Sequence, residues 1–167
     1  MATPWRSALA LLVLGAAFAS AAAAADSAFI GPKDLKWGPA PPSLPPGAQV
    51  AVLQGDPGKP GAFAVRLQVP GGYRIAPHWH SQDEALTVIS GTLYLGMGDK
   101  YDPGTARGLA AGGFHYLPAK AHHYAFAKKP TVVQINGNGP FDIVYINPAD
   151  DPQKAKPSPG APGARLE

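Results

Sequence analysis

The sequence predicts an all-β domain, and three observations favour this class. Twenty glycines and twenty prolines among 167 residues mark many turns. Short runs of strand-forming residues are bounded by clusters rich in Gly, Pro, Asn and Asp. After the apolar N-terminal stretch, no segment repeats apolar residues with a helical period over a helical length. A chain of this length corresponds to one domain, so we expect a single β-sandwich or β-barrel.

The N-terminal residues 1–25 have the pattern of a secretory signal peptide. One charge, Arg6, precedes an apolar run from Ala8 to Ala19, and small residues continue to Ala25. Cleavage is predicted after Ala25, and a site after Ala21 is the alternative. An uncleaved membrane anchor is less favoured, because alanine contributes little hydrophobicity. We therefore expect a periplasmic or secreted protein with no membrane segment after cleavage.

Two proline-rich segments flank the predicted barrel, which we assign to residues 48–148. Residues 26–47 contain six prolines and form an N-terminal arm that cannot be a helix or a central strand. This arm either runs extended over the barrel, anchored by Leu35 and Trp37, or is a disordered leader. Residues 149–167 lack large apolar residues until the last two positions and are predicted to be a flexible tail.

Nine short segments between these flanks have the composition of β-strands, and each is bounded by turn residues. The predicted strands are Gln49–Gln54, Phe63–Val69, Tyr73–Trp79, Glu84–Ser90, Thr92–Met97, Gly113–Leu117, Ala121–Ala127, Thr131–Asn136 and Phe141–Ile146.

Composition excludes several kinds of site. The chain has no cysteine, so disulfides, thiol nucleophiles and Cys-ligated metals are excluded, and a metal ion would need nitrogen and oxygen ligands. The formal net charge is +3, from 14 basic and 11 acidic residues. These bases are scattered rather than gathered in a patch or stripe, so we expect no nucleic-acid partner.

Three histidines and one glutamate have the spacing of a metal site. His78 and His80 are two residues apart on a predicted strand, so both imidazoles project to the same face. Glu84 begins the next strand and can return beside them after a tight connection. Two histidines and one carboxylate with open positions form a known type of metal site. His123 is the candidate for a further ligand, and Asp83 is the alternative to Glu84.

These residues belong to a longer pattern that resembles the cupin family. Residues 72–91 match the first cupin motif at its five fixed positions, and residues 112–127 match the second motif in part. The matching positions are Gly72, His78, His80, Glu84 and Gly91 in the first motif and Gly112, Pro118 and His123 in the second. Lys120 and Ala127 replace the usual glycine and asparagine of the second motif. Because Lys120 stands where the family has glycine, the resemblance does not fix the turn geometry before His123.

The resemblance implies a cupin β-barrel, also called a double-stranded β-helix or jelly roll. It further implies one divalent metal ion on His78, His80, Glu84 and His123. Iron, manganese, nickel, copper and zinc all suit such a ligand set, and loading outside the cytoplasm would favour copper or zinc.

The resemblance leaves two classes of function open. One is a metal-dependent oxidoreductase of the dioxygenase type, acting on a small organic molecule, with Glu84 as a ligand or, after loosening, as a general base. The other is a non-catalytic cupin that binds or senses a metal or a small ligand. The homodimer that is common among cupins is a further expectation.

Strand alternation gives expectations for the neighbours of these ligands. With His123 facing inward, Ala121, Ala125 and Ala127 face the cavity as well. The opposite face carries His122, Tyr124 and Phe126, which would need cover from the arm or from a second subunit. Arg74 has the parity of His78 and would point toward the cavity, either to bind an anionic group or to form an ion pair at the rim. His115 is expected on the surface.

Overall fold

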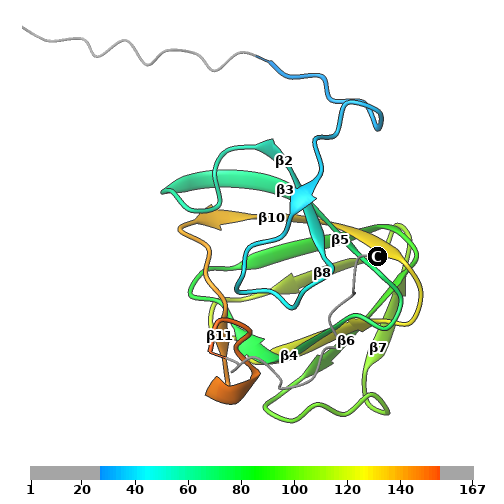
Figure 1. Ribbon diagram of the computed structural model, residues 1–167, viewed down its shortest axis with the longest axis vertical. Coiled ribbons are helices and arrows are strands. Elements are labelled where there is room, and N and C mark those ends of the chain that lie inside the picture. Colours follow the sequence, from blue (N-terminus) through cyan, green and yellow to red (C-terminus); the bar gives the residue numbers. More distant parts are fainter. Residues whose placement is uncertain (1–26, 155–167) are drawn as a thin grey trace, which may run out of the picture.

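The computed structural model describes residues 27–154 of the chain, which fold into two antiparallel β-sheets that face each other and curve into a barrel (Figure 1). No α-helix occurs in the described residues, so the all-β prediction is confirmed. The predicted signal peptide and residues 155–167 of the predicted tail lie outside the described residues.

Six strands form the first sheet, in the order β1-β2-β3-β10-β5-β8. These are β1 (Gly38–Pro39), β2 (Gln49–Gln54), β3 (Gly61–Val69), β5 (Glu84–Ser90), β8 (Phe114–Leu117) and β10 (Thr131–Gly139). The second sheet has five strands, in the order β11-β4-β9-β6-β7. These are β4 (Arg74–Trp79), β6 (Thr92–Met97), β7 (Arg107–Ala110), β9 (His123–Ala127) and β11 (Val144–Tyr145).

The strand predictions hold for nine of these segments, and the differences have local causes. The sequence did not predict β1 and β7, which are short and contain glycine, nor the 3-10 helix Pro148–Asp150 at the start of the predicted tail. Strand β9 begins at His123 rather than Ala121. The reason is a turn in which Lys120 has a φ of 64° and the amide of Ala121 donates to the carbonyl of Pro118.

The core lies between the two sheets and is built from the inward positions of nearly every strand. Its buried members are mostly aliphatic, such as Leu67, Val88, Leu95 and Val133. This alternation of inward apolar residues follows from the two-residue period of β-strands.

The proline-rich arm lies across the barrel, as the first of the two alternatives predicted. Its strand β1 pairs with β2, and Ala40 and Leu44 pack against the core. The expected anchors Leu35 and Trp37 are only half-buried. Ala40 and Leu44 make these core contacts in place of the expected anchors.

Two tyrosine hydroxyls fix the arm in place. Tyr73 donates a hydrogen bond of 2.7 Å to the carbonyl of Pro45, and Tyr145 donates one of 2.8 Å to the carbonyl of Ser43. Burial raises the pKa of Tyr73 to about 12 and that of Tyr145 above its usual value. Both hydroxyls therefore keep their protons at neutral pH.

The outer face of β9 is covered within the chain by the connection between β6 and β7. Tyr124 is 0% exposed, and its hydroxyl donates to the carbonyl of Asp102 at 2.5 Å. The ring of Tyr101 packs against both Tyr124 and Phe126. The expectation that this face needs an external cover is therefore wrong.

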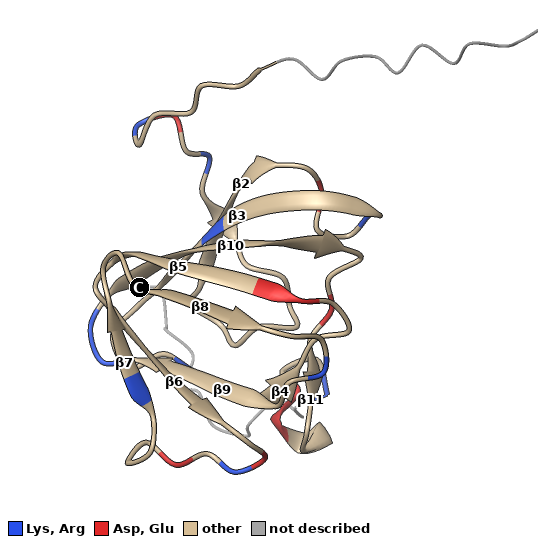
Figure 2. Ribbon diagram, turned by 180° about the vertical axis from the view of Figure 1, so that it is seen from behind, with Lys and Arg blue, Asp and Glu red and all other residues tan. Residues whose placement is uncertain are grey.

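Charged residues lie mainly in the loops, with both signs interspersed (Figure 2). Strand β5 carries a single acidic residue, Glu84. In the described residues, no helix has the length and apolar character needed to cross a membrane.

Candidate metal centre

His78, His80 and His123 converge at one end of the barrel interior. His78 lies in β4 directly opposite His123 in β9, and His80 follows one residue after β4 ends. One nitrogen from each ring lies within 4.8 Å of the others. All three residues are buried, with exposed fractions of 2%, 7% and 2%. The structure thus brings together the three histidines that the sequence predicted.

Each of these three imidazoles is oriented by a main-chain carbonyl. The Nδ1 atom of His78 donates to Ala76 at 2.7 Å, and that of His123 donates to Ala121 at 2.9 Å. The Nδ1 atom of His80 donates to the carbonyl of Asp142 at 2.5 Å. Because a carbonyl can only accept, Nδ1 carries a proton in each ring, and the neutral form of each ring then has its lone pair on Nε2. The lone pairs of the Nε2 atoms are therefore available at the centre.

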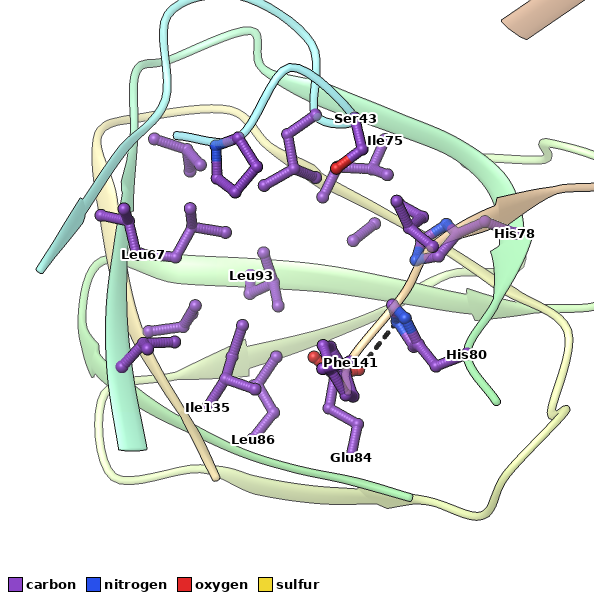
Figure 3. Close-up of a pocket in the computed structure, with 18 of the residues that line it drawn as sticks. Ser43, Leu67, Ile75, His78, His80, Glu84, Leu86, Leu93, Ile135 and Phe141 are labelled. Atoms are coloured by element: carbon purple, nitrogen blue, oxygen red, sulfur yellow. Dashed lines mark ion pairs between the residues drawn. The ribbon is translucent and has the colours of Figure 1, made fainter. Parts of the chain in front are cut away.

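Glu84 places its carboxylate beside two of these nitrogens (Figure 3). Its Oε2 atom lies 3.6 Å from Nε2 of His80 and 3.7 Å from Nε2 of His123. These distances exceed that of a hydrogen bond. Glu84 begins β5, where pairing with Leu117 of β8 and Gly137 of β10 fixes its backbone.

Burial governs the protonation of this cluster in the absence of a metal. Desolvation lowers the pKa of His78 well below its usual value, and the neighbouring His123 and His80 add to the effect. Burial also lowers the pKa of His123 to about 4. The pKa of Glu84 is raised by desolvation, against the opposing effect of His80. His78 and His123 are therefore neutral at neutral pH, as metal binding requires.

The donor set fits a divalent transition-metal ion. Three imidazole nitrogens with fixed tautomers and one buried carboxylate are ligands that Zn, Cu, Fe and Ni accept. The carbonyl partners of the Nδ1 atoms are the usual outer contacts of metal-binding histidines. His78, His80 and His123 could therefore hold a metal ion.

The neighbouring candidates lie outside this cluster. Asp83 is exposed and accepts hydrogen bonds from the hydroxyl of Tyr116 and the amide of Ala119. His122 projects away from the cavity, and its Nδ1 atom lies 2.5 Å from Asp99.

Two expectations about other basic side chains are wrong. Arg74 is exposed, and its guanidinium lies over the ring of Tyr101, 4.7 Å from the centroid. The pairing of β4 with β9 shifts in register between Ile75 and His78. Arg74 therefore projects to the face opposite that of His78. His115 is half-buried rather than on the surface, and its Nε2 atom has no hydrogen-bond partner among residues 27–154. It lies opposite Leu86 across the β5–β8 pair, which turns its side chain inward.

Two residues at the centre were not predicted from the sequence. The ring of Phe141 stacks on His80 with centroids 4.4 Å apart. Asp142 gives its carbonyl to His80, and its carboxylate accepts from the amide and hydroxyl of Ser81 at 2.7 and 2.8 Å. Both lie in a segment predicted as strand, and no spacing relates them to His80, which is 62 positions from Asp142.

A cavity of about 160 Å³ extends from the histidine cluster into the barrel (Figure 3). Its wall is mostly aliphatic, with Leu67, Leu86, Leu93 and Ile135 around the space. Ala125 and Ala127 face it as predicted, whereas Ala121 does not line it. The arm closes one side through Pro41, Ser43 and Leu44.

Comparison with known proteins gives matches in structure and none in sequence families. No protein-family model matches the chain, and no curated protein matches it in sequence. A candidate acetylacetone dioxygenase from Methylibium petroleiphilum PM1 is 18% identical with a TM-score of 0.59, and the match covers 75% of this chain and 85% of that one. The polyketide cyclase RemF from Streptomyces resistomycificus is 14% identical with a TM-score of 0.58, over 76% of this chain and 90% of that one.

A third similar structure is described as a cupin. An RmlC-like cupin from Shewanella frigidimarina NCIMB 400 is 14% identical with a TM-score of 0.52, over 68% of this chain and 91% of that one. At these identities the likeness establishes the fold alone. The two facing antiparallel sheets are those of a jelly roll, and the chain has the fold of the cupins.

Proposed function

We propose that this chain is an exported metal-binding cupin that acts as a metal-dependent oxidoreductase on a small organic molecule. The observation that carries the proposal is the convergence of three buried imidazoles, each with Nδ1 bound to a carbonyl, beside the buried carboxylate of Glu84. His78, His80, His123 and Glu84 would be the ligands of one divalent ion.

A bound redox-active metal would supply electron transfer and O₂ chemistry, which this chain's own side chains cannot provide. His78, His80, His123 and Glu84 would hold the ion, and the adjoining cavity would give a substrate access to it. The apolar wall excludes bulk water and holds a substrate beside the centre. The comparison with a candidate acetylacetone dioxygenase supports a dioxygenase-like reaction at this position in the fold.

Glu84 has a second role in the proposal. In the metal-free protein burial raises its pKa, and on loosening from the ion its carboxylate would be placed to act as a general base. Its Oε2 atom faces the cavity end of the cluster and could take a proton from a bound substrate hydroxyl or C–H group.

Metal analysis of matched histidine variants tests the ligand assignment. His123→Ala removes a cluster member, and His122→Ala removes the adjacent outward histidine that pairs with Asp99. We expect about one divalent ion per chain in the wild type and in His122→Ala, and none in His123→Ala. An equal metal content in the two variants would contradict the proposal. Sequencing the N-terminus of the protein recovered from the periplasm or medium tests export and the cleavage site.

A non-catalytic role in binding a metal or a small ligand is the second candidate. The observation that favours it is the scarcity of free acid–base groups at the cavity. Besides the cluster, the polar side chains lining the cavity are those of Ser43, Tyr73 and Asp142. Tyr73 and Asp142 already make hydrogen bonds to other groups. O₂ uptake by the protein loaded with Fe or Cu separates the two roles. An oxidoreductase would consume O₂ in the presence of a small uncharged substrate that fits the cavity, whereas a binding protein would consume none.

A further inference from the structure

The cavity wall determines which class of molecule can occupy it. Among its lining residues there is no lysine or arginine. The basic residue that strand parity would have placed there, Arg74, is exposed and stacks on Tyr101 instead. A carboxylate or phosphate in the cavity would therefore have no cationic side chain as partner. A bound metal ion would supply a positive charge only at the histidine cluster, and burying an unpaired charge against the apolar wall away from it costs far more free energy than the surrounding contacts recover.

The polar groups away from the histidine cluster are largely engaged. The Tyr73 hydroxyl donates to Pro45, and the Asp142 carboxylate accepts two hydrogen bonds from Ser81. The remaining wall is made of side chains such as Val65, Leu93 and Ile135. A ligand in this part of the cavity would be recognised by its shape and apolar surface.

The volume of the cavity limits the size of the ligand. At about 160 Å³ it is close to an engineered apolar cavity of about 150 Å³ that stays dry and binds benzene. Ala125 and Ala127 on β9 contribute to this space, because a longer side chain at either position would extend into it.

We propose that the cavity binds an uncharged molecule of about the size of one substituted six-membered ring, with its polar group toward the histidine cluster and its hydrocarbon part against the aliphatic wall. This inference rests on the proposed function for the orientation of the polar group. It disfavours molecules such as dicarboxylates, which would place a charged group against the aliphatic wall away from the cluster, and favours neutral phenols, ketones and similar small oxygen-bearing hydrocarbons.

Two probes of similar shape, one neutral and one anionic, test the inference by titration calorimetry on the metal-free protein, where no metal ion can pair with a carboxylate. Both p-cresol and 4-hydroxybenzoate carry a hydroxyl on one ring, with a methyl group or a carboxylate at the opposite end. We expect p-cresol to bind at least tenfold more tightly. Equal or tighter binding of 4-hydroxybenzoate would overturn the inference, even if separate zinc loading shows that the metal centre is intact.

Matched alanine variants place the binding in the cavity. Ala125→Leu adds a side chain inside it, whereas Ala62→Leu makes the same change at an exposed position of β3. We expect Ala125→Leu to weaken p-cresol binding at least tenfold and Ala62→Leu to leave it unchanged. Unchanged binding in Ala125→Leu, with a wild-type zinc content, would overturn the inference.

Toluene and the metal-free protein separate this inference from the proposed function. Saturable toluene binding by the metal-free wild type supports the apolar cavity without any metal. If the chain binds toluene but no metal, the metal centre alone is contradicted. Should Ala125→Leu not fold, NMR contacts between the toluene methyl group and the side chains of Leu93 and Ala125 in the wild type serve instead, and their absence would overturn the inference.

Discussion

The hydroxyl of Tyr145 donates a hydrogen bond to the carbonyl oxygen of Ser43, which joins two residues 102 positions apart. Tyr73 makes the equivalent contact with Pro45. Both bonds hold the proline-rich arm over the side of the cavity that Pro41, Ser43 and Leu44 close. The arm is therefore part of the cavity wall and not a separate leader.

Removing both hydroxyls is expected to loosen the arm. Each hydrogen bond contributes about 1 kcal/mol, so the Tyr73→Phe/Tyr145→Phe variant should lose roughly 2 kcal/mol of stability. Amide exchange at residues 40–48 should speed up more than exchange in β5 or β10. Tyr116→Phe, which removes an exposed hydroxyl contact with Asp83, is the control. Equal exchange rates in the arm of both variants would contradict this role of the tyrosines.

Lowering the pH should destabilise the metal-free protein through its buried histidines. An unfolded histidine binds a proton below about pH 6.5, whereas folded His123 stays neutral until about pH 4. Between these values the unfolded state binds more protons, so the free energy of unfolding decreases as the pH falls. For His123 alone the full loss is roughly 3 kcal/mol, and His78 acts in the same direction.

Urea unfolding of the metal-free protein at several pH values between 7.5 and 4 measures this effect. The His122→Ala variant should keep the same pH dependence, because that residue is half-exposed and lies outside the cluster. The titration of Glu84 acts in the opposite direction, so the series is repeated in the Glu84→Gln variant, where a flat profile would show that the cluster histidines gain protons in the folded state as readily as in the unfolded one.

The substitution Glu84→Gln is expected to have opposite effects on stability and on metal binding. Burial raises the pKa of Glu84, so the folded metal-free state becomes less stable as the pH rises through the usual Glu range toward that raised pKa. Glutamine keeps the shape without this cost, so the metal-free variant should unfold at a higher temperature at pH 7.5. Its zinc affinity should fall at least tenfold, as competition with a chelating dye would show. An unchanged affinity would remove Glu84 from the ligand set.

Replacing Lys120 by glycine should stabilise the protein. Lys120 has a φ of 64°, a left-handed conformation that costs a non-glycine residue about 1–2 kcal/mol. Glycine adopts it freely but adds flexibility to the unfolded chain, so the net gain should be about 1 kcal/mol or less. Lys100→Gly, at an exposed lysine without a positive φ, should give no gain. A loss of stability in Lys120→Gly would show that the lysine side chain compensates for the strain.

The strands and the His78–His80 pair could be predicted because both depend on local patterns, whereas His123 was assigned through the resemblance to the second cupin motif. Strands such as Glu84–Ser90 and Thr92–Met97 have the predicted bounds, since Gly91 between them has the positive φ that a tight turn requires. His78 and His80 project together because strand alternation holds from one to the other. The replacement of the usual glycine by Lys120 does not remove the turn before His123, because Lys120 itself adopts the left-handed conformation.

Contacts between distant segments could not be predicted in this way. Arg74 was placed in the cavity by parity, and one register shift in β4 reverses that parity. Phe141 stacks on His80, and the β6–β7 connection covers Tyr124. Both contacts depend on how a loop packs against the barrel. No spacing in the sequence predicts these contacts between loops and strands.

The main-chain carbonyls that hold the three Nδ1 atoms also bear on how this barrel can change over evolution. A carbonyl oxygen is present whatever residue occupies its position, so substitutions at Ala76, Ala121 or Asp142 need not disturb the tautomers. Selection can therefore alter the aliphatic wall, and with it the accepted ligand, while the imidazole geometry is inherited unchanged. Such independence would let one scaffold acquire new substrates through single exchanges at sites like Leu93 or Ala125.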